Sequence, residues 1–262
     1  MKVVLFCGGQ GLRIRDLSDK IPKPLVSIGQ RPILWHIMRY YAHHGHRDFI
    51  LCLGYKSEAI KRYFIDHNAY LTHDFVLSSG QAPELLGSDL QDWRITFVDT
   101  GLHANVGQRL KQVERHLGDD PYFLANYSDT LTDAPLNDWI ERFKREDAIG
   151  SFMCVRPHLS LHTVYMGENN RVREVRGISS DILINGGYFT FRRDIFDHIG
   201  LGEELVEEPF QRLIAQGALL GQRYDGFWAT MDTYKDHQHL ETLVTDEAAP
   251  WEVWKRRDAA VV

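Results

Sequence analysis

The residues best suited to chemistry lie in a short glycine-rich segment near the N-terminus. It reads Cys7-Gly8-Gly9-Gln10-Gly11-Leu12-Arg13-Ile14-Arg15-Asp16. Its three glycines allow backbone N–H groups to approach phosphate oxygens closely. Arg13 and Arg15 can add paired, charge-assisted hydrogen bonds. The segment therefore predicts phosphate binding, although an ordinary tight turn accounts for the glycines equally well.

Two common phosphate-binding motifs do not fit this segment. A dinucleotide fingerprint counted from Gly9 needs a glycine at position 14, where the chain has Ile14. A P-loop needs Gly-Lys followed by Ser or Thr, and no such triplet follows. The missing glycine argues against an NAD(P)-dependent oxidoreductase.

A lysine between two prolines comes next, in Ile21-Pro22-Lys23-Pro24-Leu25. The prolines restrict the backbone on both sides of Lys23. Its ammonium can therefore be placed at little entropic cost, which suits a group that grips a phosphate during transfer. A solvated lysine in a rigid loop is the simpler alternative.

Alternating strands and helices must position these groups. Buried strands are expected at Val3–Phe6, Phe49–Leu53, Arg94–Val98 and Tyr122–Ala125, and helices at Pro32–His44, Ser57–Phe64, Gly107–His116 and Pro135–Arg145. Ser57 is the expected N-cap of its helix. This alternation predicts a parallel sheet with helices on both faces. Because ligands bind at the carboxyl ends of such strands, the segments after the four strands should line one crevice.

The second half of the chain is richer in strands. Strands are expected at Ser151–Val155, Thr163–Met166, Arg171–Val175, Ile184–Phe191 and Leu219–Tyr224, and helices at Glu208–Gln216 and Tyr234–Val244. We expect these strands to extend the sheet or to form a small β lobe. With 262 residues and no clear linker, the chain suits one domain.

Composition excludes several classes of partner. The net charge of −6 gives no basic excess for nucleic acid or an anionic membrane. No apolar run approaches about 20 residues, so no membrane span is expected. The first strand begins too early for a signal peptide. We therefore expect a cytoplasmic protein without nucleic-acid or membrane partners.

The cysteines and clustered histidines predict no metal site. Cys7, Cys52 and Cys154 lie far apart in apolar runs without a CxxC pair, which is typical of buried reduced thiols. The histidines are His36, His43, His44 and His46. Their spacing does not suit tetrahedral zinc, and we expect surface and interface positions for them.

Taken in order, the motifs resemble those of the sugar-phosphate nucleotidyltransferases. The chain has a strand, then Gly-Gly-x-Gly-x-Arg, then Pro-Lys-Pro. The resemblance is greatest to the glucose-1-phosphate cytidylyltransferases and runs from residue 1 to about residue 255. The further matching segments are Arg31–Met38, Gly54–Lys56, Val98–Gly101, Ile184–Phe189, Phe227–Trp228, Met231–Thr233 and Ala249–Trp251.

The resemblance implies a fold and a reaction. The fold would be a Rossmann-like, three-layer α/β/α fold of the GT-A-like kind, with a mixed, mostly parallel sheet and a small β extension. Within the single domain, 1–150 would be the nucleotide-binding half, 151–245 the sugar-phosphate-binding half and 246–262 a tail. The reaction would transfer a nucleotidyl group, expected to be cytidylyl from CTP, to a sugar 1-phosphate. Its products would be a CDP-glucose-like NDP-sugar and pyrophosphate. A homo-oligomer is also expected.

The resemblance also assigns the metal. Asp129, in Ser128-Asp129-Thr130, and Asp232, in Met-Asp-Thr, match aspartates that hold Mg²⁺ in the family. Mg²⁺ prefers hard oxygen ligands and takes one or two protein carboxylates beside phosphates and water. A single aspartate at a strand end is more often a turn former or helix cap.

Other roles follow residue by residue. Arg13 and Lys23 would be catalytic. Arg13 would hold the leaving β- and γ-phosphates, and Lys23 would bridge the α-phosphate and the sugar phosphate. The nucleotide would lie along Gly8, Gly9 and Gly11, with Arg109 in the region that selects the base. The sugar side would use Asn185, Gly186, Glu208 and Arg176.

Three departures from the family pattern stand out. The family has Thr where this chain has Leu12, and Gly where it has Thr130. A Glu-Lys-Pro segment whose lysine grips the sugar phosphate is missing; Arg173 or Arg176 is the expected substitute. Arginine and lysine are not equivalent at a tight phosphate site. The sequence therefore leaves open a nucleotide-binding regulatory homologue with little or no turnover.

Overall fold

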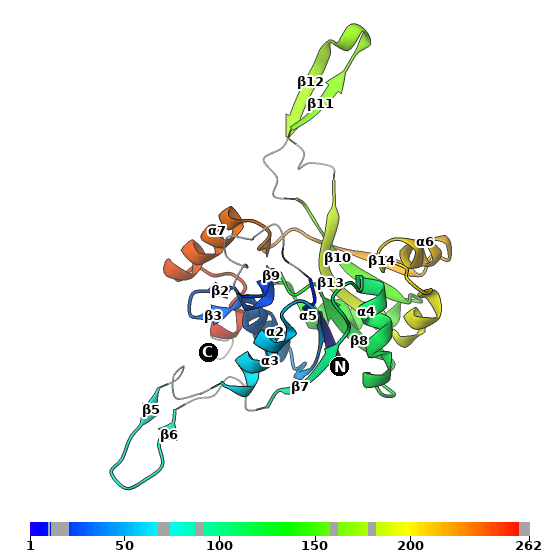
Figure 1. Cartoon of the computed structure of the whole chain (residues 1–262). Helices are drawn as coiled ribbons and strands as arrows, with labels where there is room; N and C mark the ends of the chain where they lie inside the picture. Colours follow the sequence, from blue (N-terminus) through cyan, green and yellow to red (C-terminus); the bar gives the residue numbers. More distant parts are fainter. Residues whose placement is uncertain are drawn as a thin grey trace, which may run out of the picture.

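A seven-stranded sheet forms the centre of the protein in a computed structural model. The structure describes residues 1–9, 11, 21–67, 74–86, 92–157, 162–177 and 182–256. Its strands are β1 (Lys2–Phe6), β4 (Asp48–Leu53), β7 (Arg94–Asp99), β8 (Tyr122–Asn126), β10 (Gly150–Val155), β13 (Ile184–Arg192) and β14 (Leu219–Tyr224). Their order is β14-β10-β13-β8-β1-β4-β7 (Figure 1). Neighbours are parallel except where β13 pairs with β8 and β10, so the expected mixed, mostly parallel sheet is confirmed.

Helices cover both faces of this sheet. One face packs against α2 (Ile33–His43), α3 (Ser57–Ile65), α5 (Leu136–Arg145) and α7 (Tyr234–Thr245), and the other against α4 (Val106–Val113) and α6 (Glu208–Ala215). Strand β1 shows why both faces of the sheet must be covered. Val3 and Leu5 join the first core, whereas Val4 and Phe6 join the second. Because successive side chains point to opposite faces, a strand that is apolar throughout needs cover on both sides. The three-layer fold is therefore confirmed.

Four two-stranded pairs lie outside the main sheet. They are β2 (Ser27–Ile28) with β3 (Arg31–Pro32), β5 (Phe75–Val76) with β6 (Glu84–Leu85), β9 (Thr130–Thr132) with β15 (Trp228–Thr230), and β11 (His162–Met166) with β12 (Val172–Gly177). The β11–β12 hairpin projects away from the body and supplies the expected β extension (Figure 1). The β9–β15 pair was not expected from the sequence; Asp129 and Asp232 flank its strands.

Helix ends differ from expectation in two places. Ser57 is the first residue of α3 rather than its N-cap; the cap is Lys56, with φ 49° and no capping side chain. The helix expected over 107–116 ends at Val113 and continues as a 3-10 turn, Glu114–His116. Residues of the described chain form no helix long and apolar enough to cross a membrane.

A histidine expected at the surface lies instead in the core. His36 is only 3% exposed, and its Nε2 lies 3.0 Å from the carbonyl oxygen of Ile28. The indole N–H of Trp251 donates to Nδ1 at 3.2 Å. Since an indole can only donate, Nδ1 must accept and Nε2 carries the proton. Trp251 is fully buried, so part of the segment expected as a tail completes the core.

This histidine gives the first prediction. Burial lowers the pKa of His36 to about 4, below the value of about 6.5 in an unfolded chain. The unfolded state therefore binds the proton more readily, and stability present above about pH 6.5 is lost as the pH falls toward 4. We expect His36 to contribute a loss of about 2 kcal/mol between about pH 7.5 and about pH 5.

Urea unfolding of the wild type and His36→Gln at both pH values measures this loss. Glutamine keeps one donor and one acceptor but does not titrate. His44 and His46, whose pKa values burial also lowers to about 4, are present in both proteins and cancel in the comparison. Equal losses on acidification in the two proteins would contradict the prediction.

Candidate active site

Two aspartates from distant parts of the chain are brought together by the β9–β15 pair. Asp129 directly precedes β9, and Asp232 follows β15. Thr130 pairs with Thr230, and the backbone N–H of Met231 donates to the carbonyl of Asp129 at 3.0 Å. This short antiparallel ladder fixes the two carboxylates beside each other at the edge of the main sheet.

Lys23 lies between these carboxylates. Its Nζ donates to Oδ2 of Asp129 at 2.8 Å and to Oδ1 of Asp232 at 2.7 Å. Lys23 begins a 3-10 turn between Pro22 and the buried Pro24. Burial alone would lower the pKa of Lys23, but the two carboxylates raise it above its ordinary value. The prolines thus present a charged ammonium where the sequence predicted one.

The donor set fits a magnesium ion. Asp129 and Asp232 converge on one cationic group, so the space between their oxygens suits a positive charge. Mg²⁺ takes one or two carboxylates and leaves the remaining positions to phosphates and water. Within the described ranges, no three His, Cys, Asp or Glu side chains are grouped to hold a metal. The two carboxylates therefore provide the kind of hard oxygen donors that Mg²⁺ takes from a protein.

The backbone before Asp129 is sharply turned. Ser128 has φ +66°, in the left-handed region. The side-chain oxygen of Asn126 accepts from the backbone N–H of Ser128 at 2.8 Å, and the Ser128 hydroxyl lies 3.3 Å from Sγ of Cys7. The turn directs Asp129 toward Lys23 and ties it to the residue that follows β1.

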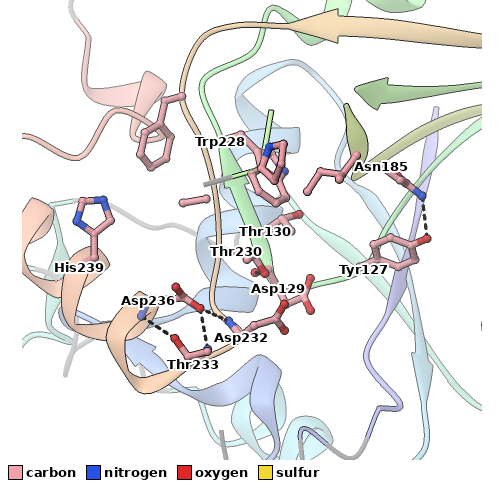
Figure 2. A pocket seen from close by; sticks show the side chains of 14 residues that line it. Tyr127, Asp129, Thr130, Asn185, Trp228, Thr230, Asp232, Thr233, Asp236 and His239 are labelled. Atoms are coloured by element: carbon pink, nitrogen blue, oxygen red, sulfur yellow. Dashed lines mark hydrogen bonds between the residues drawn. The ribbon is translucent and has the colours of Figure 1, made fainter. Parts of the chain in front are cut away.

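A cavity of about 690 Å³ adjoins the two aspartates (Figure 2). A volume in this range is typical of small-molecule sites. The cavity is lined by Tyr127, Asp129, Thr130, Pro157, Ile184, Asn185, Phe227, Trp228, Ala229, Thr230, Asp232, Thr233, Asp236 and His239. In Figure 2, Asn185 and Tyr127 lie on one side and His239 on the other.

Hydrogen bonds fix the polar wall of this cavity. Asn185 donates from Nδ2 to the hydroxyl of Tyr127 at 3.1 Å and accepts from the N–H of Gly187 at 2.9 Å. The indole N–H of Trp228 donates to the carbonyl of Gly186 at 2.8 Å. Asn185, predicted from the sequence, therefore lines the same cavity as the predicted aspartates, and Gly186 is bonded to the lining residue Trp228.

The glycines of the first turn lie at the expected crevice. A Cβ atom on Gly54 would come within 2.8 Å of the carbonyl oxygens of both Gly8 and Gly101. The chain segments after β4, β1 and β7 therefore meet, as expected. Gly9 is exposed, and Gly11 has φ +61°. Arg109 lies beneath Gly8, 4% exposed. Leu12, Arg13 and Arg15 lie outside the described residues.

Gly186, Glu208 and Arg176, three of the predicted sugar-site residues, do not line the cavity. Glu208 is the exposed first residue of α6. Arg176 lies on the projecting hairpin, where its guanidinium pairs with Glu174 and stands 5.5 Å from the ring centroid of Tyr165.

The lining residues that sequence reasoning missed include Tyr127, Asp236 and His239. For Asp236 the sequence did contain a recognisable pattern. Thr233 followed three residues later by an acidic residue is the pattern of a capping box, and Asp236 forms one with Thr233 at the start of α7. Tyr127 and His239 carry no such pattern.

Sequence comparisons with known proteins identify the family of this chain. The sequence matches the family described as Nucleotidyl transferase over residues 2–228. It is 36% identical over 260 residues to a probable glucose-1-phosphate cytidylyltransferase of Bacillus subtilis (strain 168), covering 97% of this chain and 100% of that protein. It is 33% identical over 258 residues to the glucose-1-phosphate cytidylyltransferase of Salmonella typhi, with the same coverage of 97% and 100%.

A solved structure supports the fold independently. The UTP-bound UGPase of Acinetobacter baumannii superposes with a TM-score of 0.70 at 16% identity, covering 94% of this chain and 93% of that one. At that identity the likeness concerns the fold alone. The sequence match and the full-length relatives carry the assignment: this chain belongs to the nucleotidyl transferase family.

Proposed function

We propose that this protein transfers a cytidylyl group from CTP to glucose 1-phosphate, forming CDP-glucose and pyrophosphate. One observation carries the proposal: Lys23, Asp129 and Asp232 converge from three parts of the chain at the rim of a cavity large enough for a sugar phosphate. The full-length relatives named as glucose-1-phosphate cytidylyltransferases support the choice of base and sugar.

The chemistry needs little acid–base help from the protein. A phosphate oxygen of the sugar phosphate attacks the α-phosphorus of CTP. The bond from that phosphorus to the oxygen bridging the β-phosphate breaks, and pyrophosphate leaves with the electron pair. Because the attacking oxygen is already anionic, no strong general base is required. Catalysis then consists mainly of positioning and neutralisation of charge.

Lys23 is well suited to that neutralisation. In the proposed reaction its ammonium turns from the carboxylates to the α-phosphate and the sugar phosphate, which otherwise repel each other. Asp129 and Asp232 would hold Mg²⁺, which when bound neutralises phosphate charge. Arg13 is proposed from the sequence to hold the leaving phosphates.

The sugar is proposed to bind in the cavity beside these groups. The amide of Asn185 is held in place by Tyr127 and Gly187, so it can meet a hydroxyl without reorganisation. Ile184, Phe227 and Ala229 supply apolar surface for the C–H groups of a sugar ring.

Released pyrophosphate tests the reaction. The protein would be incubated with Mg²⁺, each of CTP, UTP, dTTP, ATP and GTP, and a panel of sugar 1-phosphates. We expect release with CTP and glucose 1-phosphate. Release with CTP and a different sugar phosphate alone would replace the proposed acceptor. No release with any pair, although CTP raises the melting temperature, would favour a regulatory homologue.

The two carboxylates give a second prediction for this site. Asp129→Asn and Asp232→Asn each remove one anionic oxygen donor, so we expect kcat to fall by about 100-fold or more. Pyrophosphate release at saturating substrates measures kcat, and melting temperature checks folding. Asp246→Asn, at an exposed position after α7, is the matched control and should retain full activity. Wild-type kcat in both site variants would refute the assignment.

The charge of Lys23 gives a further prediction for this site. Lys23→Met keeps an unbranched stem but loses the ammonium, so we expect kcat to fall by about 100-fold or more. Lys23→Arg keeps the charge in a different geometry and should retain more activity than methionine. Parallel measurements of kcat decide the point. A methionine variant as active as the arginine variant would show that the charge of Lys23 is not used.

A further inference from the structure

The buried guanidinium of Arg109 connects the ends of three neighbouring strands. Nη1 donates to the carbonyl of Leu53 at 3.1 Å and to the hydroxyl of Thr100 at 2.7 Å. Nη2 donates to the carbonyl of Gly8 at 3.1 Å and to that of Leu102 at 3.5 Å. These acceptors lie at or just after the ends of β4, β7 and β1. One side chain therefore ties together the strand ends that form the crevice.

These bonds leave the two terminal nitrogens with no hydrogen for a ligand. A guanidinium has five N–H donors, four of them on Nη1 and Nη2. All four have acceptors within the protein. A direct grip on the nucleotide by the guanidinium fork, which the family resemblance implied for this region, would require some of these hydrogen bonds to break.

The surrounding glycines fit the guanidinium closely. A Cβ atom on Gly8 would lie 2.0 Å from Nη1 of Arg109, and one on Gly54 would lie 2.9 Å from it. Only glycine leaves room for the side chain at these two places. Gly8 and Gly54 thus accommodate the guanidinium beneath the turn.

The bond to Gly8 also sets the direction of the next N–H. In a trans peptide the C=O and the following N–H point in opposite directions. The carbonyl of Gly8 accepts from Arg109 beneath the turn at 3.1 Å and from the backbone N–H of Tyr55 at 3.3 Å. The N–H of Gly9 therefore points away from the guanidinium, and Gly9 is exposed.

Arg109 also brings a buried positive charge to this position. Its guanidinium has no carboxylate oxygen within 4.0 Å among the residues that the structure describes, although Asp99 acts on it electrostatically. The field of a buried charge acts strongly on its surroundings because water screens it little.

We propose that Arg109 is a positioning residue for the triphosphate of the nucleotide. It turns the N–H of Gly9 toward the phosphates and places a positive charge beneath them without touching them. This inference rests on the proposed function, because it takes a nucleoside triphosphate as the ligand of the crevice.

Three variants and a control test the role. Arg109→Met removes the charge and the hydrogen bonds, and Arg109→Lys keeps the charge. Thr100→Val removes one acceptor of Arg109, together with the bond from that hydroxyl to the carbonyl of Leu53, at nearly constant volume. Arg115→Met, at an exposed arginine just after α4, is the control. Calorimetry gives the Kd of CTP with Mg²⁺, and kinetics give kcat and both KM values.

We expect Arg109→Met to raise the Kd and KM for CTP by about 10-fold or more, with KM for glucose 1-phosphate within about twofold of the wild type. Arg109→Lys should lie between methionine and the wild type. Thr100→Val should raise the Kd for CTP by about threefold, and the control should not change it.

Two results would overturn the inference alone. One is normal CTP binding in Arg109→Met and Thr100→Val when the wild type binds CTP. The other is an equal rise in both KM values with a loss of folded protein, since that marks a purely structural role. A wild type that binds none of the five nucleoside triphosphates would instead overturn the proposed function, and this inference with it.

Discussion

The site depends on one constraint: the parallel strands β1, β4, β7 and β8 all end at the same edge of the sheet. Each strand delivers its following residues to that edge, whatever their separation in the sequence. Gly8, Gly54, Gly101 and Asp129 therefore meet although more than 100 residues separate the first from the last. The antiparallel strand β13 adds Asn185 from the other half of the chain. The direction of the strands therefore brings the site residues together, and the helices cover the faces of the sheet.

Charge is distributed unevenly over this edge. Two carboxylates share one ammonium at the rim of the cavity. A buried arginine lies at the neighbouring strand ends, where it donates to backbone carbonyls and a hydroxyl. Carboxylates and a guanidinium at neighbouring positions suit a ligand that combines a bound cation with anionic phosphates.

Local sequence patterns identified most of the main sheet and its helices, because apolar runs and helix periodicity are local properties. They also identified Lys23, since two prolines around a lysine fix a backbone irrespective of the rest of the fold. The β9–β15 pair escaped detection because its strands are three residues each and are defined only by each other. The burial of His36 was missed for a related reason: its partner Trp251 lies 215 residues away. The sequence also does not reveal that Arg109 donates to three backbone carbonyls and one hydroxyl within the protein.

The contact between His36 and Trp251 has a consequence for how the polypeptide reaches its native state. It closes a loop of 215 residues, and contacts of such long range contribute late in folding because the chain entropy must be lost first. Helix α2 is synthesised before its partner, which lies 215 residues further along the chain. During that interval the part of α2 that Trp251 covers lacks this contact, and exposed apolar surface promotes aggregation. Biosynthesis of this protein thus includes a period in which His36 has been made but its tryptophan partner has not.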